Sequence, residues 1–221
     1  MDLEQARFNM IEQQIRPWEV LDGEVLNLLS VVKREQFVPQ GLQALAFVDM
    51  ELPLREGGAR GQSMLAPRLE ARLLQDLTVL KHEKVLEIGT GSGYMTALLA
   101  HCAAHVLSLE IEPTLAAQAR QNLAAAGVHN VEVRTTDGTS GAAADGPFDV
   151  IVLSGSVAEV PQALLTQLKI GGRLAAIVGD EPVMRATLIT RNSETAWTTA
   201  QPWDTVAPRL VHFAEHSAFS F

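Results

Sequence analysis

The feature that most constrains the fold is a glycine-rich turn between a short apolar run and a segment with helical spacing. The run at 85–88 (VLEI) leads into Gly89, Gly91 and Gly93, and the helical pattern begins at Tyr94. Glycine at every second position lets the chain turn sharply and lets a ligand come close to the backbone. A buried strand, such a turn and a helix in this order indicate a nucleotide-type binding site.

Short apolar runs and helical segments alternate from residue 84 onward. The predicted strands are 85–88, 106–109, 131–133, 150–153 and 174–178, and the predicted helices are 94–102, 115–126 and 160–168. This alternation predicts an α/β fold in which helices cover both faces of a parallel sheet. The last forty residues are less regular, and we expect strands there at 184–190 and 211–214.

The first third of the chain has helical spacing interrupted by loops. Asp22 suits the N-cap of one helix, and Pro67 suits the first turn of another. We expect residues 1–80 to form a helical segment with a loop that covers the site, and residues 81–221 to form the binding core. A length of 221 residues fits one compact domain containing both parts.

Charge and cysteine content exclude several classes of partner. Seventeen Lys and Arg against 26 Asp and Glu give a net charge of −9, which opposes binding to nucleic acid or to anionic lipid. Cys102 is the only cysteine, and no apolar run approaches the ~18 residues of a membrane span. We therefore expect a soluble, cytoplasmic protein. His101 and His105 straddle a predicted helix end without a companion glutamate, so no metal site is predicted.

The spacing of the turn narrows the choice of ligand. A dinucleotide fingerprint requires glycine where Tyr94 stands, and a phosphate-binding P-loop requires a lysine that is absent. Glu87 would repel a pyrophosphate, whereas a carboxylate suits a ligand that carries an ammonium group and a sulfonium.

Polar groups also follow the next strands. Glu110 ends the second strand, 21 residues after Gly89, where its carboxylate can accept hydrogen bonds from two ribose hydroxyls. Asp137 could accept from an adenine amino group, while Gly138 lets the ring lie close to the backbone, and Ser154 follows the fourth strand. Each acid taken singly could equally be a helix cap or a turn residue.

The segment VLEIGTGSGYMTALLA resembles the first motif of S-adenosylmethionine-dependent methyltransferases, specifically of the protein-L-isoaspartate O-methyltransferase family. The same family pattern is followed, in order, by RFNMIEQQIRPWEVLDGEVLNLL, REQFVPQ, GQSMLAP, TTDGTSG and PFDVIVLSGSVAEVPQALLTQLKIGGRLAAIVG. The resemblance covers roughly residues 6–179. It implies a Rossmann-like, seven-stranded class I methyltransferase fold with an N-terminal helical extension. It also implies methyl transfer from S-adenosylmethionine, with S-adenosylhomocysteine as product, to the free carboxylate of L-isoaspartyl residues in damaged proteins.

Site roles carried over from the family fall into two groups. The glycine turn would line the methionine end of the cofactor, Glu110 the ribose, and Asp137 with Gly138 the adenine. The expected cofactor-binding residues are Glu87, Gly89, Thr90, Gly91, Ser92, Gly93, Glu110, Ile111, Asp137, Gly138 and Ser154. Gln62 and Ser63 match the Gln-Thr of the family loop that covers the cofactor and the substrate carboxylate, and they are the expected catalytic residues.

The chain departs from the family two residues later, which would make it a divergent member. The family has serine and glutamine where this chain has Leu65 and Ala66. A lost hydrogen bond to a charged group costs about 1.5–3 kcal/mol, which impairs a reaction without abolishing it. Two alternatives to isoaspartyl methylation stay open: a relative that methylates a small molecule, and one that binds the cofactor but has lost catalysis.

Other expectations concern how the substrate is reached. We expect the loop at 57–67 to close over the site as a lid, and Arg60 or Arg209 to guide an anionic protein or peptide substrate. Either a monomer or a homodimer is compatible with the sequence.

Overall fold

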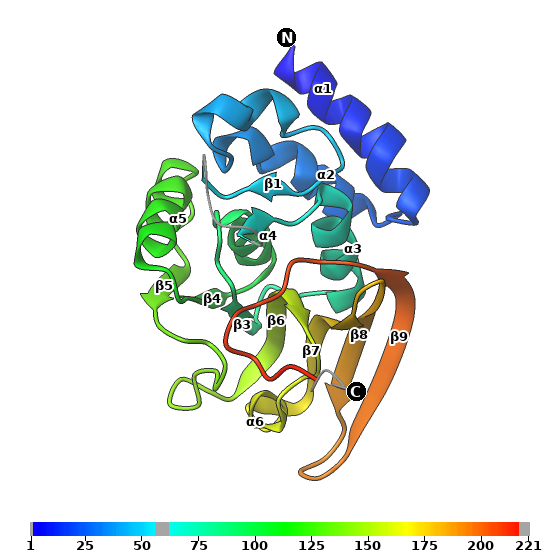
Figure 1. The fold of residues 1–221 in the computed structure, drawn as a ribbon, viewed down its shortest axis with the longest axis vertical. Coiled ribbons are helices and arrows are strands. Elements are labelled where there is room, and N and C mark those ends of the chain that lie inside the picture. Colours follow the sequence, from blue (N-terminus) through cyan, green and yellow to red (C-terminus); the bar gives the residue numbers. More distant parts are fainter. Residues whose placement is uncertain (1, 56–61, 217–221) are drawn as a thin grey trace, which may run out of the picture.

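A seven-stranded sheet organises the computed structural model, which describes residues 2–55 and 62–216. The strand order is β5-β4-β3-β6-β7-β8-β9 (Figure 1). The strands are β3 (Lys84–Ile88), β4 (His105–Glu110), β5 (Val131–Thr135), β6 (Phe148–Val157), β7 (Leu168–Asp180), β8 (Val183–Arg191) and β9 (Trp197–Thr205). The first five in the spatial order run parallel, and β8 and β9 are antiparallel to their neighbours. The seven-stranded α/β prediction is confirmed, with a mixed rather than a wholly parallel sheet.

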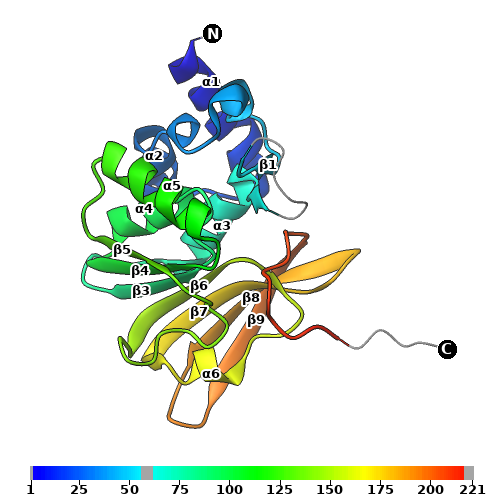
Figure 2. The same ribbon diagram turned by 60° about the vertical axis from the view of Figure 1, so that its left-hand side comes forward.

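Helices lie on both faces of this sheet, but unequally. Figure 2 shows α3, α4 and α5 over one face, with α1 and α2 beyond them, and the short α6 against the other face. The helices are α1 (Leu3–Met10), α2 (Gly23–Val31), α3 (Pro67–Leu77), α4 (Tyr94–Cys102), α5 (Pro113–Ala125) and α6 (Gln162–Leu165), with shorter helical turns η1 (Ile11–Ile15), η2 (Arg16–Trp18), η3 (Arg34–Gln36) and η4 (Gln40–Leu45). As expected, Asp22 caps α2, since its Oδ1 accepts from the backbone N–H of Glu24 and Val25. No helix of the described residues has both the length and the apolarity to cross a bilayer.

Alternate residues of each strand face opposite sides, so the sheet separates two apolar cores. Val85 and Val106 join the core on the side of the larger helices, whereas Leu86 and Leu107 join the other. The first core continues into the N-terminal helices, where Ile15 and others are fully buried. The core therefore runs without interruption from the sheet into the N-terminal helices.

One element prediction is wrong, and another is too long. Residues 211–214 form no strand, and the seventh strand is β9, which contains Pro202. Proline lacks an N–H to donate, but β9 is an edge strand and tolerates it. The helix predicted over 160–168 reduces to the four residues of α6, because Leu168 already pairs with Phe148 as the first residue of β7.

Candidate functional site

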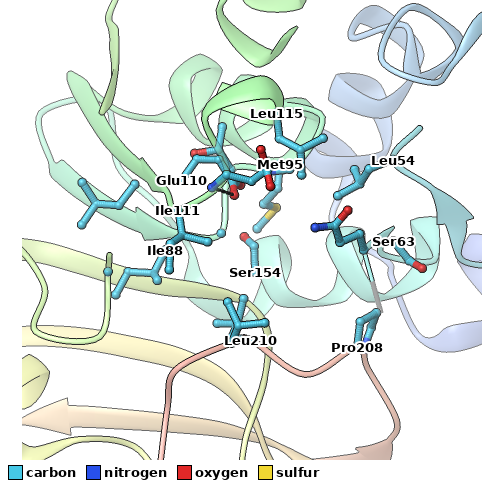
Figure 3. A pocket seen from close by; sticks show the side chains of 18 of the residues that line it. Leu54, Ser63, Ile88, Met95, Glu110, Ile111, Leu115, Ser154, Pro208 and Leu210 are labelled. Atoms are coloured by element: carbon cyan, nitrogen blue, oxygen red, sulfur yellow. Dashed lines mark hydrogen bonds between the residues drawn. The ribbon is translucent and has the colours of Figure 1, made fainter. Parts of the chain in front are cut away.

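A cavity lies at the carboxyl ends of β3, β4 and β6, the edge where ligands bind in such sheets. The space between its atoms is about 920 Å³, a figure that includes open solvent. Figure 3 shows Glu110 and Ile111 on one side, Leu54 and Ser63 on the other, and Ser154 between them. The predicted site residues that line it are Gln62, Ser63, Gly89, Thr90, Gly91, Ser92, Glu110, Ile111, Asp137, Gly138 and Ser154, and Leu65, at the position of the family serine, also lines it.

The glycine turn forms one wall through its backbone. Gly89 has a φ of +91°, a conformation that side chains disfavour, and its N–H donates to the carbonyl of Leu109 at 2.9 Å. A Cβ at Gly89 would lie 2.8 Å from Cδ2 of Leu210. The backbone angle therefore favours glycine here, and a Cβ would also force the side chain of Leu210 to move.

Glu110 connects the end of β4 to that turn. Its Oε2 accepts from the N–H of Gly91 at 2.8 Å, and its Oε1 accepts from the N–H of Glu112 at 3.0 Å. Only 6% of the residue is exposed. A carboxylate has about four acceptor positions, so Glu110 can still accept from two hydroxyls of a ligand in the cavity.

Glu87 lies beneath the cavity and does not line it, in contrast to the expected ligand contact. It is fully buried, and its carboxylate accepts from the hydroxyls of Thr96, Ser108 (2.7 Å) and Ser154 (2.8 Å). Burial raises the pKa of Glu87 to about 7, against the opposing effect of these three hydrogen bonds. Glu87 therefore fixes the side chain of Ser154, which does reach the cavity wall.

Gly93 also stays outside the cavity lining. It is the N-cap of α4, with a φ of +86°, and a Cβ there would lie 3.3 Å from Cγ of Leu123. Close packing of the turn on α5 therefore accounts for this third glycine.

Asp137 and Gly138 form the part of the wall next to β3. Oδ1 of Asp137 accepts from the N–H of Thr139 at 2.9 Å, and Oδ2 lies 2.8 Å from Nδ1 of His212. These two contacts, the first above all, lower the pKa of Asp137. At Gly138 a Cβ would lie 2.5 Å from Cγ2 of Ile88, so the absence of a side chain lets this turn pack closely on β3.

The covering wall comes from the N-terminal part of the chain. Gln62 lies next to a small antiparallel pair of strands, β1 (Leu52–Pro53) and β2 (Ser63–Met64), and its Oε1 accepts from Arg55 at 2.9 Å. Leu65 lines the cavity, yet only 3% of it is exposed. Residues 57–61 of the predicted lid, including Arg60, lie outside the described residues.

The C-terminal segment closes the cavity from below, which the sequence did not predict (Figure 3). Pro208 and Leu210 line the cavity and hydrogen-bond through their backbones to Ser156, at 2.7 and 2.9 Å. The guanidinium of Arg209 pairs with Asp180 at 2.6 Å and with Glu215 at 3.2 Å. Because Arg209 forms ion pairs with two acidic residues, its charge is compensated and it is a poor candidate to guide an anionic substrate, contrary to our expectation.

Several lining residues on regular elements were also missed. Met95 and Leu115 lie in the first turns of α4 and α5, and Glu70 lies in α3. Apolar residues at helical spacing indicate a core, so only their position just after a strand end could have suggested a ligand site. Within residues 2–55 and 62–216, no three His, Cys, Asp or Glu side chains gather as metal ligands.

Comparison with known proteins identifies relatives over almost the whole chain. Residues 5–205 match the family model of protein-L-isoaspartate(D-aspartate) O-methyltransferase. A protein-L-isoaspartate O-methyltransferase of Methanoculleus marisnigri is 44% identical over 173 residues, covering 78% of this chain and 77% of its own. A protein-L-isoaspartate O-methyltransferase 2 of Marinobacter nauticus is 41% identical over 204 residues, covering 92% of this chain and 91% of its own.

Solved structures share the fold. A Plasmodium falciparum protein described as a putative protein-L-isoaspartate O-methyltransferase, in complex with S-adenosyl-L-homocysteine, superposes with a TM-score of 0.76 at 18% identity. The match covers 92% of this chain and 98% of that one. It confirms the class I methyltransferase architecture.

Proposed function

The chain belongs to the protein-L-isoaspartate(D-aspartate) O-methyltransferase family, and on that basis we propose that it methylates the free carboxylate of L-isoaspartyl residues in damaged proteins. The methyl donor is S-adenosylmethionine, and S-adenosylhomocysteine is the product. The reaction repairs neither peptide bond nor side chain directly; it esterifies the abnormal carboxylate.

Family membership carries the proposed substrate, and the charge of the cavity wall is the structural observation that supports the cofactor. Among the described residues, the lining includes Glu110, Glu112 and Asp137, a fourth acid, Glu70, that is paired with Arg34, and one arginine, Arg209, that is paired with Asp180. Such a wall opposes a phosphate-rich ligand and suits one that carries an ammonium group and a sulfonium. The residues present therefore fit S-adenosylmethionine, which supplies an activated methyl group when bound.

We assign the residues around the cofactor as follows. The backbone of the glycine turn and Ser154 would hold the methionine part, Glu110 the ribose hydroxyls, and Asp137 the adenine edge. Glu87 would not contact the cofactor itself; it would orient the Ser154 hydroxyl, which donates a hydrogen bond to it. Gln62 and Ser63 would contact the acceptor, since both line the cavity and Ser63 lies on the side opposite Glu110 (Figure 3).

This arrangement requires no general base. A carboxylate acceptor is already ionised at neutral pH, so the protein has to align it with the methyl carbon and sulfur and exclude water. Leu54, Leu65 and Leu210 supply apolar surface to the cavity wall, which strengthens the attraction between the acceptor anion and the sulfonium.

The activity for which the relatives are named argues against two alternatives: a small-molecule acceptor and the loss of catalysis. The two relatives described above, at 44% and 41% identity, are protein-L-isoaspartate O-methyltransferases. Leu65 remains a departure from the family, and the loss it implies is a reduction in rate.

The test is transfer of radiolabelled methyl groups to an isoaspartyl peptide, with the same peptide carrying ordinary aspartate as the control. We expect label in the isoaspartyl peptide only, released by mild base as methanol because the product is an ester. Binding of S-adenosylhomocysteine by calorimetry without any transfer would refute the proposed function while leaving the cofactor site intact.

We also propose a cytoplasmic location and a single compact domain with its parts at 1–80 and 81–221. The lone, half-buried Cys102 supports the former, and the core shared between the two parts supports the latter. Monomer and homodimer both remain compatible with the chain, and light scattering on the purified protein distinguishes them.

A further inference from the structure

A buried arginine lies behind the wall of the cavity that faces the acceptor. Arg34, in η3, is fully buried, and its Nη2 donates to the backbone carbonyl of Leu65 at 2.8 Å. Its Nη1 forms an ion pair with Glu70 of α3, which is itself only 2% exposed. Both Leu65 and Glu70 line the cavity.

The same side chain also reaches the glycine turn. The guanidinium carbon of Arg34 lies 5.2 Å from the ring centre of Tyr94, within the range of a cation–π contact. Tyr94 is the first residue of α4 and follows the turn directly, and its ring packs edge-on against Phe37. One guanidinium thus joins the covering segment 62–66, the helix α3 and the start of α4.

We propose that Arg34 is a positioning residue for methyl transfer, which holds the segment 62–66 at the acceptor side of the cavity through the carbonyl of Leu65. The inference rests on the proposed function for its kinetic consequences. The planar guanidinium of arginine bonds two acceptors in fixed directions, whereas the donors of a lysine ammonium rotate on a flexible stem.

Charge gives Arg34 a second effect on the same wall. Burial raises the pKa of Glu70 to about 7, and the contact with Arg34 acts in the opposite direction, toward the ionised form that pairs with the guanidinium. The ion pair neutralises Glu70, so the wall next to Leu65 carries no net charge.

A second buried ion pair, which involves the next residue of η3 but does not reach the cavity wall, provides the control. Arg7 and Glu35 form this pair, and Arg7 also lies over an aromatic ring, that of Phe47. Neither Arg7 nor Glu35 lines the cavity. Removing this pair therefore tests the general cost of losing a buried salt bridge.

The experiment compares two double variants, Arg34→Met/Glu70→Leu and Arg7→Met/Glu35→Leu. Removing both charges of a buried pair avoids an unpaired buried charge, so both proteins should fold. We expect the first to lose five- to twentyfold in kcat/KM for the isoaspartyl peptide, with the Kd of S-adenosylhomocysteine within twofold of wild type. The second should change neither value by more than twofold.

Three results would overturn the proposal. These are unchanged kcat/KM in the first variant, an equal loss in the second, and a parallel loss of cofactor affinity, which would indicate general collapse. If the first variant does not fold, Arg34→Lys keeps the charge beside Glu70 and should still lower kcat/KM at least threefold; unchanged kinetics would overturn the proposal.

A readout that needs no activity separates this inference from the proposed function. Amide exchange of residues 63–65 should accelerate at least fivefold in Arg34→Lys relative to wild type, with exchange in the sheet unchanged. If wild type transfers no methyl group to the peptide, the proposed function fails, and the exchange rates still decide whether Arg34 holds this segment.

Discussion

Glu110 provides the sharpest test of the cofactor site. Replacement by alanine removes the carboxylate that lines the cavity at the end of β4 and that accepts from the backbone of Gly91 and Glu112. If the two ribose hydroxyls bind this carboxylate, its loss should cost about 1.5–3 kcal/mol of binding free energy. At about 1.4 kcal/mol for each factor of ten, the Kd should rise roughly 10- to 150-fold.

Isothermal titration calorimetry with S-adenosylhomocysteine measures this change. A cooperative thermal unfolding transition would establish that the variant is folded. We expect its melting temperature to be lower than that of wild type, because the backbone N–H groups of Gly91 and Glu112 lose their acceptor. Glu110→Gln keeps the shape and one acceptor oxygen, so its loss of affinity should be smaller.

Glu132→Ala is the matched control. Glu132 is an exposed glutamate of β5 outside the cavity, so its replacement makes the same change in net charge without touching the site. Its Kd should equal that of wild type. A folded Glu110→Ala protein with wild-type affinity would remove Glu110 from the binding site, and an equal loss in Glu132→Ala would point to long-range charge alone.

Three further substitutions test other parts of the site. Burial raises the pKa of Glu87 from 4.5 to about 7, so the folded state retains the proton and loses stability relative to the unfolded chain as the pH rises through this range. Urea unfolding of Glu87→Gln should therefore show its stability rising relative to wild type by up to about 3 kcal/mol between pH 4.5 and 7, whereas a difference independent of pH would contradict the shift. Gly138→Ala should lower the unfolding free energy by about 1–3 kcal/mol, because the new methyl group meets Ile88, and an unchanged melting temperature would argue against that contact. Leu65→Ser should cost about 2–4 kcal/mol of stability by burying a hydroxyl in place of an apolar side chain, yet raise kcat/KM for the isoaspartyl peptide about tenfold; an unchanged kcat/KM would show that the family serine is not what this site lacks.

Local patterns in the sequence were enough to predict the strands, the glycine turn and the helix that surround the site. A strand, a turn and a helix follow from hydrophobic spacing and glycine over a few adjacent residues. In a parallel sheet the carboxyl ends of all strands lie at one edge, so Glu110, Asp137 and Ser154 could be brought together without coordinates. The family resemblance added the identity of the cofactor, which spacing alone left open.

The errors share a physical origin. Glu87 was expected at the ligand because it precedes the turn, but strand residues alternate between faces, and the side chain points into a cluster of hydroxyls below the cavity. The strand expected at 211–214 and the helix expected at 160–168 were short apolar runs, whose type depends on what they pack against.

The sequence by itself determined which strand ends carry acidic residues and which turn consists largely of glycine, because each of these features is set by a few adjacent residues. Only the tertiary structure decided that Leu210 packs on Gly89, and that Arg34 holds the carbonyl of Leu65. These partners are separated by 121 and 31 residues along the chain. Contacts over such separations are set by the path of the whole backbone and the shape of the packed core, so no local pattern encodes them.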